Sequence, residues 1–249
     1  MFVIAGVSLD SQWKAVDHNL AAAEKLLENA TADLLLLPEM FATGFCMDAD
    51  DIADKGKVLQ WMKQLAKNKD SAVAGSVAVR DDGQFYNRFY FVQPDGNTAC
   101  YDKRHLFSYA GEEKIYTAGK DRVIIKYKGL NILLQVCYDL RFPVFQRNND
   151  DYDLMLNVAS WPGKRIDAWQ TLLKARAIEN QCYAFGLNRS GTDGNDLEYP
   201  ESSYCFAPDG NDISTKNGDI ITANIDKEYL NRFRDKFPFL KDRDRFTLD

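Results

Sequence analysis

The hydrophobic positions of the chain alternate between strand-type and helix-type spacing. Residues 2–9 alternate loosely as in a strand, and apolar positions then recur at helical spacing across residues 13–29. Residues 33–37 form a compact apolar run that ends at a proline, which is typical of a strand buried on both faces. A strand, a helix and a second strand in this order predict an α/β fold.

The same alternation continues through the rest of the chain. Helices are predicted at residues 57–69 and 166–180. Further strands are predicted at residues 71–79, 85–93, 98–102, 123–126, 131–137, 154–159, 183–187, 204–207 and 219–225. Strands thus occur in both halves with helices between them, and neither GxGxxG nor GxxxxGK[ST] is present. We therefore expect a four-layer αββα sandwich of two sheets flanked by helices rather than a Rossmann sheet.

Two Pro-Asp-Gly turns, at residues 94–96 and 208–210, each follow a predicted strand. Such residues preset the backbone angles of a hairpin, so we predict two hairpins in two comparable sheets.

Residues 233–249 mix phenylalanines with charges, and we interpret them as a C-terminal arm that packs against the body or against a second subunit, with a frayed tail as the alternative. The composition shows no sharp shift, so residues 1–249 are expected to form a single domain.

The bulk composition excludes several classes of function. Hydrophobic residues make up 45% and charged residues 27%, as in an ordinary soluble globular protein. A net charge of -6 argues against nucleic acid or a membrane surface as a partner. The chain shows no basic leader and no apolar run long enough for a bilayer, so we expect a cytoplasmic protein. The five cysteines are scattered without a CxxC pair, which fits neither a disulfide framework nor a zinc site, and no metal or cofactor is predicted.

Cys137 is the candidate nucleophile because it ends an apolar strand and is followed by polar, turn-forming residues. A strand end fixes the side chain, and the loop after it offers backbone N–H groups to a developing negative charge. The alternative is a small core residue, the usual role of an isolated cysteine in an apolar run.

A thiol with an ordinary pKa of about 8.5 needs a base at neutral pH. Of the two histidines, His18 lies among polar residues of the first predicted helix and is expected on the surface, which leaves His105. Glu39 directly follows a buried strand, where burial would raise its pKa toward that of a base. An oxyanion also needs a cation, and Lys103 and His105 share one face of a strand end, so spacing alone leaves both open.

These residues belong to motifs that resemble the nitrilase superfamily of carbon–nitrogen hydrolases. The motifs are Leu37-Pro38-Glu39, Tyr101-Asp102-Lys103-Arg104-His105-Leu106-Phe107 and Val136-Cys137-Tyr138-Asp139-Leu140-Arg141-Phe142-Pro143, and the segments 157–162 and 176–181 agree with them. The resemblance implies a catalytic set of Glu39, Lys103 and Cys137. It also implies a second glutamate between the lysine and the cysteine, for which Glu112 matches best and Glu113 competes.

The amino-acid sequences of these motifs are similar to those of the ω-amidase branch of that superfamily. The implied reaction releases ammonia from the side-chain amide of small dicarboxylic monoamides, 2-oxoglutaramate or 2-oxosuccinamate, through a thioester on Cys137. The Tyr138 backbone N–H would share the oxyanion with Lys103. Other branches, including nitrilases, aliphatic amidases, ureidopropionases and hydrolases of N-carbamoyl amines, carry the same triad. The resemblance also implies a homodimer and no cofactor.

A dicarboxylic monoamide brings a carboxylate, which a planar guanidinium suits. Arg165 is the candidate for this contact, and Arg141 is interpreted as structural. Aromatic side chains are the expected walls of the pocket: Phe41, Phe45, Tyr138 and Trp161. Two rival functions remain, a Cys–His acyl transferase or protease that uses His105, and a non-enzymatic binding protein on an amidase scaffold.

Overall fold

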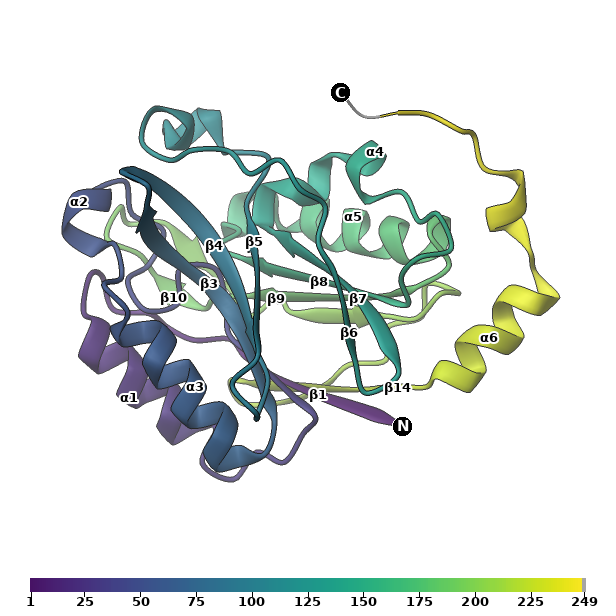
Figure 1. Cartoon of the computed structure of the whole chain (residues 1–249), viewed down its shortest axis with the longest axis horizontal. Helices are drawn as coiled ribbons and strands as arrows, with labels where there is room; N and C mark the ends of the chain where they lie inside the picture. The colour runs from purple at the N-terminus through teal and green to yellow at the C-terminus, as the bar shows by residue number, and fades with distance from the viewer. Residues whose placement is uncertain (248–249) are drawn as a thin grey trace.

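The structure, a computed structural model, describes residues 1–247 and contains two mixed β-sheets packed face to face (Figure 1). The larger sheet has the order β13 (Thr215–Asn217), β14 (Ile220–Ile225), β1 (Phe2–Val7), β2 (Leu34–Leu36), β3 (Ala72–Asp81), β4 (Gln84–Val92) and β5 (Thr98–Asp102). The smaller sheet has the order β12 (Tyr204–Phe206), β9 (Tyr183–Asn188), β8 (Leu154–Ala159), β7 (Leu130–Val136) and β6 (Ile124–Tyr127). A short hairpin of β10 (Gly191–Thr192) and β11 (Glu198–Tyr199) stands apart from both sheets.

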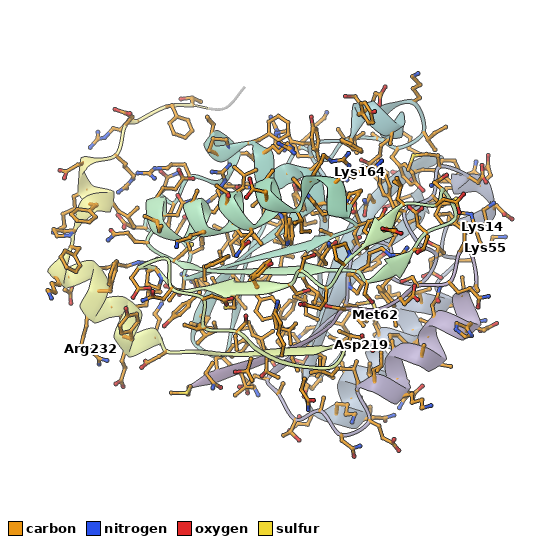
Figure 2. All side chains as sticks on the ribbon, turned by 180° about the vertical axis from the view of Figure 1, so that it is seen from behind. Lys14, Lys55, Met62, Lys164, Asp219 and Arg232 are labelled. Atoms are coloured by element: carbon orange, nitrogen blue, oxygen red, sulfur yellow. The ribbon has the colours of Figure 1, made fainter. Side chains whose placement is uncertain are left out.

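Helices cover the outer face of each sheet. The helices are α1 (Val16–Leu26), α2 (Ala49–Ile52), α3 (Lys57–Lys69), α4 (Pro143–Gln146), α5 (Ile166–Glu179) and α6 (Lys227–Lys236). α1 and α3 pack against the larger sheet, with Met62 of α3 buried there, while α5 packs against the smaller sheet (Figure 2). Side chains such as Ile4, Leu36, Phe91 and Leu156 fill the space between the sheets. The predicted αββα sandwich is therefore confirmed.

The direction of the strands brings the candidate residues to one edge. β1, β2 and β3 are parallel, as are β7, β8 and β9, and two antiparallel steps turn β5 into the same direction as β3. In such sheets, ligands bind beyond the carboxyl ends of the strands. Glu39 follows β2, Lys103 follows β5 and Cys137 follows β7, so all three leave the sheets at strand carboxyl ends.

One of the two predicted hairpins is wrong. β4 and β5 form the first as expected, around residues 94–96. The second turn, at residues 208–210, is closed by a bridge between Phe206 and Asp212 and by the bond from the Ala207 N–H to the Asn211 carbonyl. β12 belongs to the smaller sheet and β14 to the larger one, so the chain crosses between sheets after this turn. Turn residues report a local reversal of the chain, but they do not report which sheet the next strand joins.

The C-terminal segment begins earlier than position 233. Residue 233 lies inside α6, whose first turn is capped by the Asp226 side chain, which accepts the N–H groups of Glu228 and Tyr229. After α6 the chain runs outside the sheets through η5 (Phe239–Asp242) toward α4 (Figure 1). Leu240 is buried in this segment, and residues 248–249 of the predicted arm lie outside the described residues. Within residues 1–247, no helix is long and apolar enough to cross a bilayer.

Candidate active site

Glu39, Lys103 and Cys137 line one cavity, as the motifs predicted. Lys103 Nζ donates to Glu39 Oε1 at 2.8 Å, across 64 positions of sequence. Glu39 Oε2 accepts the Ser160 N–H at 2.9 Å, and the Cys137 thiol points toward the Ser160 carbonyl with a sulfur–oxygen distance of 4.0 Å. Ser160, directly after β8, thus contacts the carboxylate through its backbone N–H and the sulfur through its backbone carbonyl. Sequence reasoning missed the Ser160 N–H, which carries no side-chain signal.

Cys137 sits at a sharp bend between β7 and the 3-10 helix η3 (Cys137–Arg141). Its φ angle is +44°, in the left-handed region that a non-glycine residue occupies at a cost of about 1–3 kcal/mol. The bend puts the Tyr138 N–H in the first turn of η3, where backbone donors have no partner within the helix. A free N–H next to a sulfur nucleophile is suited to an oxyanion.

The buried carboxylate of Asp139 ties the lysine segment to the cysteine segment. Its Oδ2 accepts the Val136 N–H at 2.9 Å and the Tyr101 hydroxyl at 2.8 Å. Its Oδ1 accepts the His105 N–H at 3.0 Å and lies 2.7 Å from His105 Nδ1. The four contacts flank Cys137 on one side and Lys103 on the other, so they set the two segments against each other.

The structure separates His105 from Lys103, although spacing alone put them on one face. The His105 ring stacks on Phe142 with a centroid distance of 3.9 Å, and it does not line the cavity that holds Cys137. The strand ends at Asp102, and the chain then turns, so the two-residue period no longer applies. A Cys–His mechanism therefore has no base at the thiol.

Lys103 is an ammonium held between two buried carboxylates. Its Nζ lies 2.9 Å from Glu112 Oε2 and 3.1 Å from Glu112 Oε1, in addition to its bond with Glu39. Burial alone lowers the pKa of Lys103, but the charges of Glu112 and Glu39 outweigh it and hold this pKa above its usual value. Burial raises the pKa of Glu112, and the Lys103 charge opposes it only in part. Glu113 is exposed, so the structure brings Glu112 and not Glu113 to the lysine.

The surroundings of Cys137 favour the protonated form of its thiol. Burial raises its pKa well above the usual value, the Glu39 charge raises it further, and Lys103 opposes both only in part. A protonated thiol is a weak nucleophile, so reaction requires a base that removes the proton during attack. Glu39 is the carboxylate placed to do so, because it lines the same cavity as Cys137 and its Oε2 accepts the N–H of Ser160, whose carbonyl the thiol faces.

Asn87 of β4 also reaches this cluster and was missed from the sequence. Its Nδ2 donates to Glu39 Oε1 at 2.8 Å and to Glu112 Oε1 at 3.2 Å. Its Oδ1 is buried without a hydrogen-bond partner among the described residues, a situation that costs about 1–3 kcal/mol. The sequence did contain a pattern that could have identified Asn87, because this polar residue interrupts a row of aromatic side chains on one face of the strand, at Phe85, Phe89 and Phe91.

The cavity has a volume of about 410 Å³, enough for a small amide, and its walls combine aromatic side chains with charged and polar ones. Phe45, Tyr138 and Trp161 line it as predicted, together with Phe107. The Phe45 ring centroid lies 5.1 Å from Lys103 Nζ. Phe41 does not contribute, because it is buried in the core under α3.

Two guanidinium groups lie on the wall of the cavity. Arg165 lines it as predicted, with its Cζ 5.3 Å from the ring centroid of Phe107. Arg141, interpreted from the sequence as structural, also lines it, with its Cζ 4.9 Å from the ring centroid of Trp161. Arg141 is exposed at the end of η3 because the chain turns after Cys137. The periodicity of the sequence does not predict this turn.

The β10–β11 hairpin supplies another wall, which sequence reasoning did not find. The Tyr199 hydroxyl donates to Asp193 Oδ2 at 2.8 Å, and Asp193 Oδ1 accepts the N–H groups of Asn195 and Leu197. All four of these residues line the cavity. As for metals, the described part of the chain contains no group of three or more His, Cys, Asp or Glu side chains that could hold an ion.

The chain is similar to several known proteins. The chain matches the family model of carbon–nitrogen hydrolases over residues 4–235. It is 44% identical over 241 residues to omega-amidase YafV of Yersinia enterocolitica, which covers 95% of this chain and 94% of that protein. It is 32% identical to the 2-oxoglutaramate amidase of Bacillus subtilis (strain 168), over 97% of each chain. The crystal structure of XC1258 from Xanthomonas campestris, a CN-hydrolase superfamily protein with an arsenic adduct in its active site, aligns with a TM-score of 0.96 and 38% identity, covering 100% of this chain and 99% of that one.

Proposed function

The chain belongs to the carbon–nitrogen hydrolase family, and from this premise we propose that it is an ω-amidase that hydrolyses the side-chain amide of small dicarboxylic monoamides. The proposed substrates are 2-oxoglutaramate and 2-oxosuccinamate, and the products are ammonia and the corresponding dicarboxylate. Relatives named omega-amidase and 2-oxoglutaramate amidase support this choice. The observation that carries it is the contact of Glu39 and Lys103 beside Cys137 at a small cavity with two guanidinium groups on its wall.

In the proposed first step, Glu39 takes the thiol proton while the Cys137 sulfur attacks the amide carbon. The carbonyl π bond breaks, and its electron pair becomes an oxyanion that Lys103 and the Tyr138 N–H stabilise. Because burial and the Glu39 charge raise the pKa of the thiol, we propose that proton transfer and attack occur together.

In the following steps the oxyanion collapses and breaks the carbon–nitrogen bond. The nitrogen takes the proton from Glu39 and leaves as ammonia, and the acyl group stays on Cys137 as a thioester. Glu39, ionised again, removes a proton from water, which attacks the thioester carbon. The carbon–sulfur bond breaks, the thiol regains its proton, and the carboxylate product leaves.

An ammonia-release assay over a panel of compounds tests the function. The panel holds 2-oxoglutaramate, 2-oxosuccinamate, glutamine, a nitrile and an N-carbamoyl compound. We expect the two oxo-acid amides to be the best substrates by kcat/KM. Turnover of the nitrile or the carbamoyl compound in preference to both would replace the ω-amidase proposal with another reaction of the same family.

We propose that Arg141 and Arg165 bind the substrate carboxylate. Charge-assisted bonds of this kind contribute about 1.5–3 kcal/mol, so Arg165→Ala and Arg141→Ala should each raise the KM for 2-oxoglutaramate by roughly 10- to 100-fold. Steady-state kinetics with pentanamide, which lacks the carboxylate, provides the comparison. Both variants should leave the kcat/KM for pentanamide within about threefold of the unmodified protein, because only the charged contact is lost.

Lys164→Ala is the matched control for the two arginine variants. Lys164 is an exposed cation directly beside Arg165, and it does not line the cavity (Figure 2). Its removal should leave the KM for 2-oxoglutaramate unchanged. The anion site would be refuted if both arginine variants kept the preference of the unmodified protein for the charged substrate.

We also propose a homodimer that forms through α5 and the C-terminal segment. Four large apolar side chains on this side of the molecule are exposed: Val144, Ile178, Phe239 and Phe246. Light scattering should give twice the 28.4 kDa mass of one chain. Ile178→Asp should shift the protein toward the monomer, because it places a charge in an apolar contact. Lys126→Asp, an exposed change on β6, should not; a monomer without either change would refute the proposal.

We further propose that the chain acts as one carbon–nitrogen hydrolase domain in the cytoplasm. Support for one domain comes from the core between the sheets, which takes side chains from both of them. All five cysteines are free thiols, including the exposed Cys100, which fits a reducing compartment.

A further inference from the structure

Three carboxylate oxygens already surround the Lys103 ammonium group in the resting site. An ammonium group has three N–H donors. Three carboxylate oxygens lie within hydrogen-bond distance of Nζ: Glu39 Oε1 at 2.8 Å, Glu112 Oε2 at 2.9 Å and Glu112 Oε1 at 3.1 Å. The Lys103 side chain has no surface exposed to solvent. For Lys103 to stabilise an oxyanion, one of these bonds must open while its carboxylate stays buried.

Asn87 supplies a second donor to the same oxygen. Its Nδ2 lies 2.8 Å from Glu39 Oε1, the atom that also accepts from Lys103, and 3.2 Å from Glu112 Oε1. The two carboxylates determine the orientation of the amide, because a carbonyl oxygen in the place of Nδ2 would face two acceptors. This orientation leaves Oδ1 buried and unpartnered, so the fold keeps the donor at the cost of the acceptor.

We propose that Asn87 is a positioning residue that releases Lys103 to the oxyanion. During attack, Glu39 gains the thiol proton and loses its charge, which weakens the bond from Lys103 to Glu39 Oε1. The lysine then turns that N–H to the substrate oxygen, while Asn87 keeps Glu39 Oε1 paired. Glu112 remains bonded to Lys103 and accepts the Phe107 N–H at 2.6 Å, so the ammonium stays anchored. This inference rests on the proposed amidase mechanism and adds a residue to it.

Asn87→Leu tests the role, because leucine fills a similar volume without a donor. Since Lys103 must then leave the Oε1 atom of Glu39 unpaired, kcat for 2-oxoglutaramate should fall by roughly 10- to 100-fold, somewhat less than the loss of a direct oxyanion donor. KM should stay within about threefold, because Asn87 does not line the cavity. Asn87→Ser, which retains one hydroxyl donor, should lose less activity than Asn87→Leu. If the leucine variant does not fold, the activity of the serine variant serves as the test.

Binding of two probes separates positioning from general damage. The aldehyde 5-oxopentanoate can form a thiohemiacetal, in which the Cys137 sulfur bonds to the aldehyde carbon and the carbonyl oxygen takes the place of the oxyanion. Glutarate carries a carboxylate at both ends and binds without a covalent bond. Asn87→Leu should weaken 5-oxopentanoate by the same factor as kcat and leave glutarate unchanged, as measured by calorimetry.

Asn157→Leu is the matched control. Asn157 is a buried amide on β8 whose polar side-chain atoms have no hydrogen-bond partner among the described residues. This variant should keep kcat and both affinities. Equal loss of both probes in the Asn87 variants, or kcat within twofold of the unmodified protein, would overturn the positioning role. Failure of the unmodified protein to release ammonia from any amide would instead refute the proposed function, and the aldehyde measurement would still test Asn87.

Discussion

Cys137→Ala should abolish ammonia release from 2-oxoglutaramate, with a loss of at least about 10⁴-fold in kcat. The reason is that no other group at the site can form the covalent intermediate. Cys46 is the other cysteine that lines the cavity, but no contact ties it to Glu39 or Lys103. The measurement is ammonia release, together with mass spectrometry of the protein quenched during turnover. An acyl adduct should appear on the unmodified protein and not on the variant.

Cys100→Ala is the control for this experiment, because Cys100 is an exposed thiol on β5. It should retain full activity and the same adduct. The circular dichroism spectrum of Cys137→Ala should match that of the unmodified protein. Activity above about 1% of normal in a correctly folded Cys137→Ala protein would exclude nucleophilic catalysis by this residue.

Lys103→Met should cost both activity and stability. Loss of the cation removes an oxyanion donor, and such donors contribute roughly 10²- to 10³-fold to kcat. It also leaves the carboxylates of Glu39 and Glu112 buried next to each other without a cation. Breaking a buried ion pair in this way costs about 3–5 kcal/mol of unfolding free energy, which urea denaturation at about pH 8 should reveal.

The stability loss in Lys103→Met should shrink as the pH falls. Burial already raises the pKa of Glu112, and Lys103 opposes that rise, so its removal raises this pKa further. A carboxyl group whose pKa is higher in the folded than in the unfolded state holds its proton more tightly when folded. The variant therefore gains stability below that raised pKa and loses it as the pH rises through it. Urea denaturation at about pH 5.5 and about pH 8 measures the difference.

Lys126→Met provides the control, because Lys126 is an exposed lysine on β6. Its unfolding free energy should equal that of the unmodified protein at both pH values. A deficit of the same size at both pH values in Lys103→Met would mean that the carboxylates take up no proton. The buried carboxylate pair would then not be the cause of the instability.

Much of the fold follows from local pattern. The helix expected at residues 57–69 is α3, and the strand expected at residues 98–102 is β5, each to the residue. Both carry clear signals, a helical apolar stripe in one case and a hairpin turn before the strand in the other. The predicted helix at residues 13–29 is shorter, because α1 begins at Val16 and ends at Leu26. Apolar spacing extends into the flanking loops, where it no longer depends on helical hydrogen bonds.

Some residues of the candidate site also follow from local pattern, and others do not. Glu39 and Cys137 were predicted because each follows a buried apolar run, which places a reactive group at the end of a strand. Ser160 and Asn87 were not predicted, because their role lies in contacts with Glu39 across 121 and 48 positions of sequence. Neither residue changes the local pattern enough to identify its partner.

The sequence alone determined the two-sheet sandwich, the places of its main strands along the chain, and the three chemical groups that follow β2, β5 and β7. The tertiary structure decided which of two nearby residues reaches the site. Lys103 contacts the carboxylates, whereas His105 contacts Asp139. Glu112 is buried, whereas Glu113 is exposed. The physical reason is that periodicity records which side of an element is buried. The partner of a polar atom instead depends on loops that meet after the sheets have packed, and adjacent residues in one loop can then point to opposite environments.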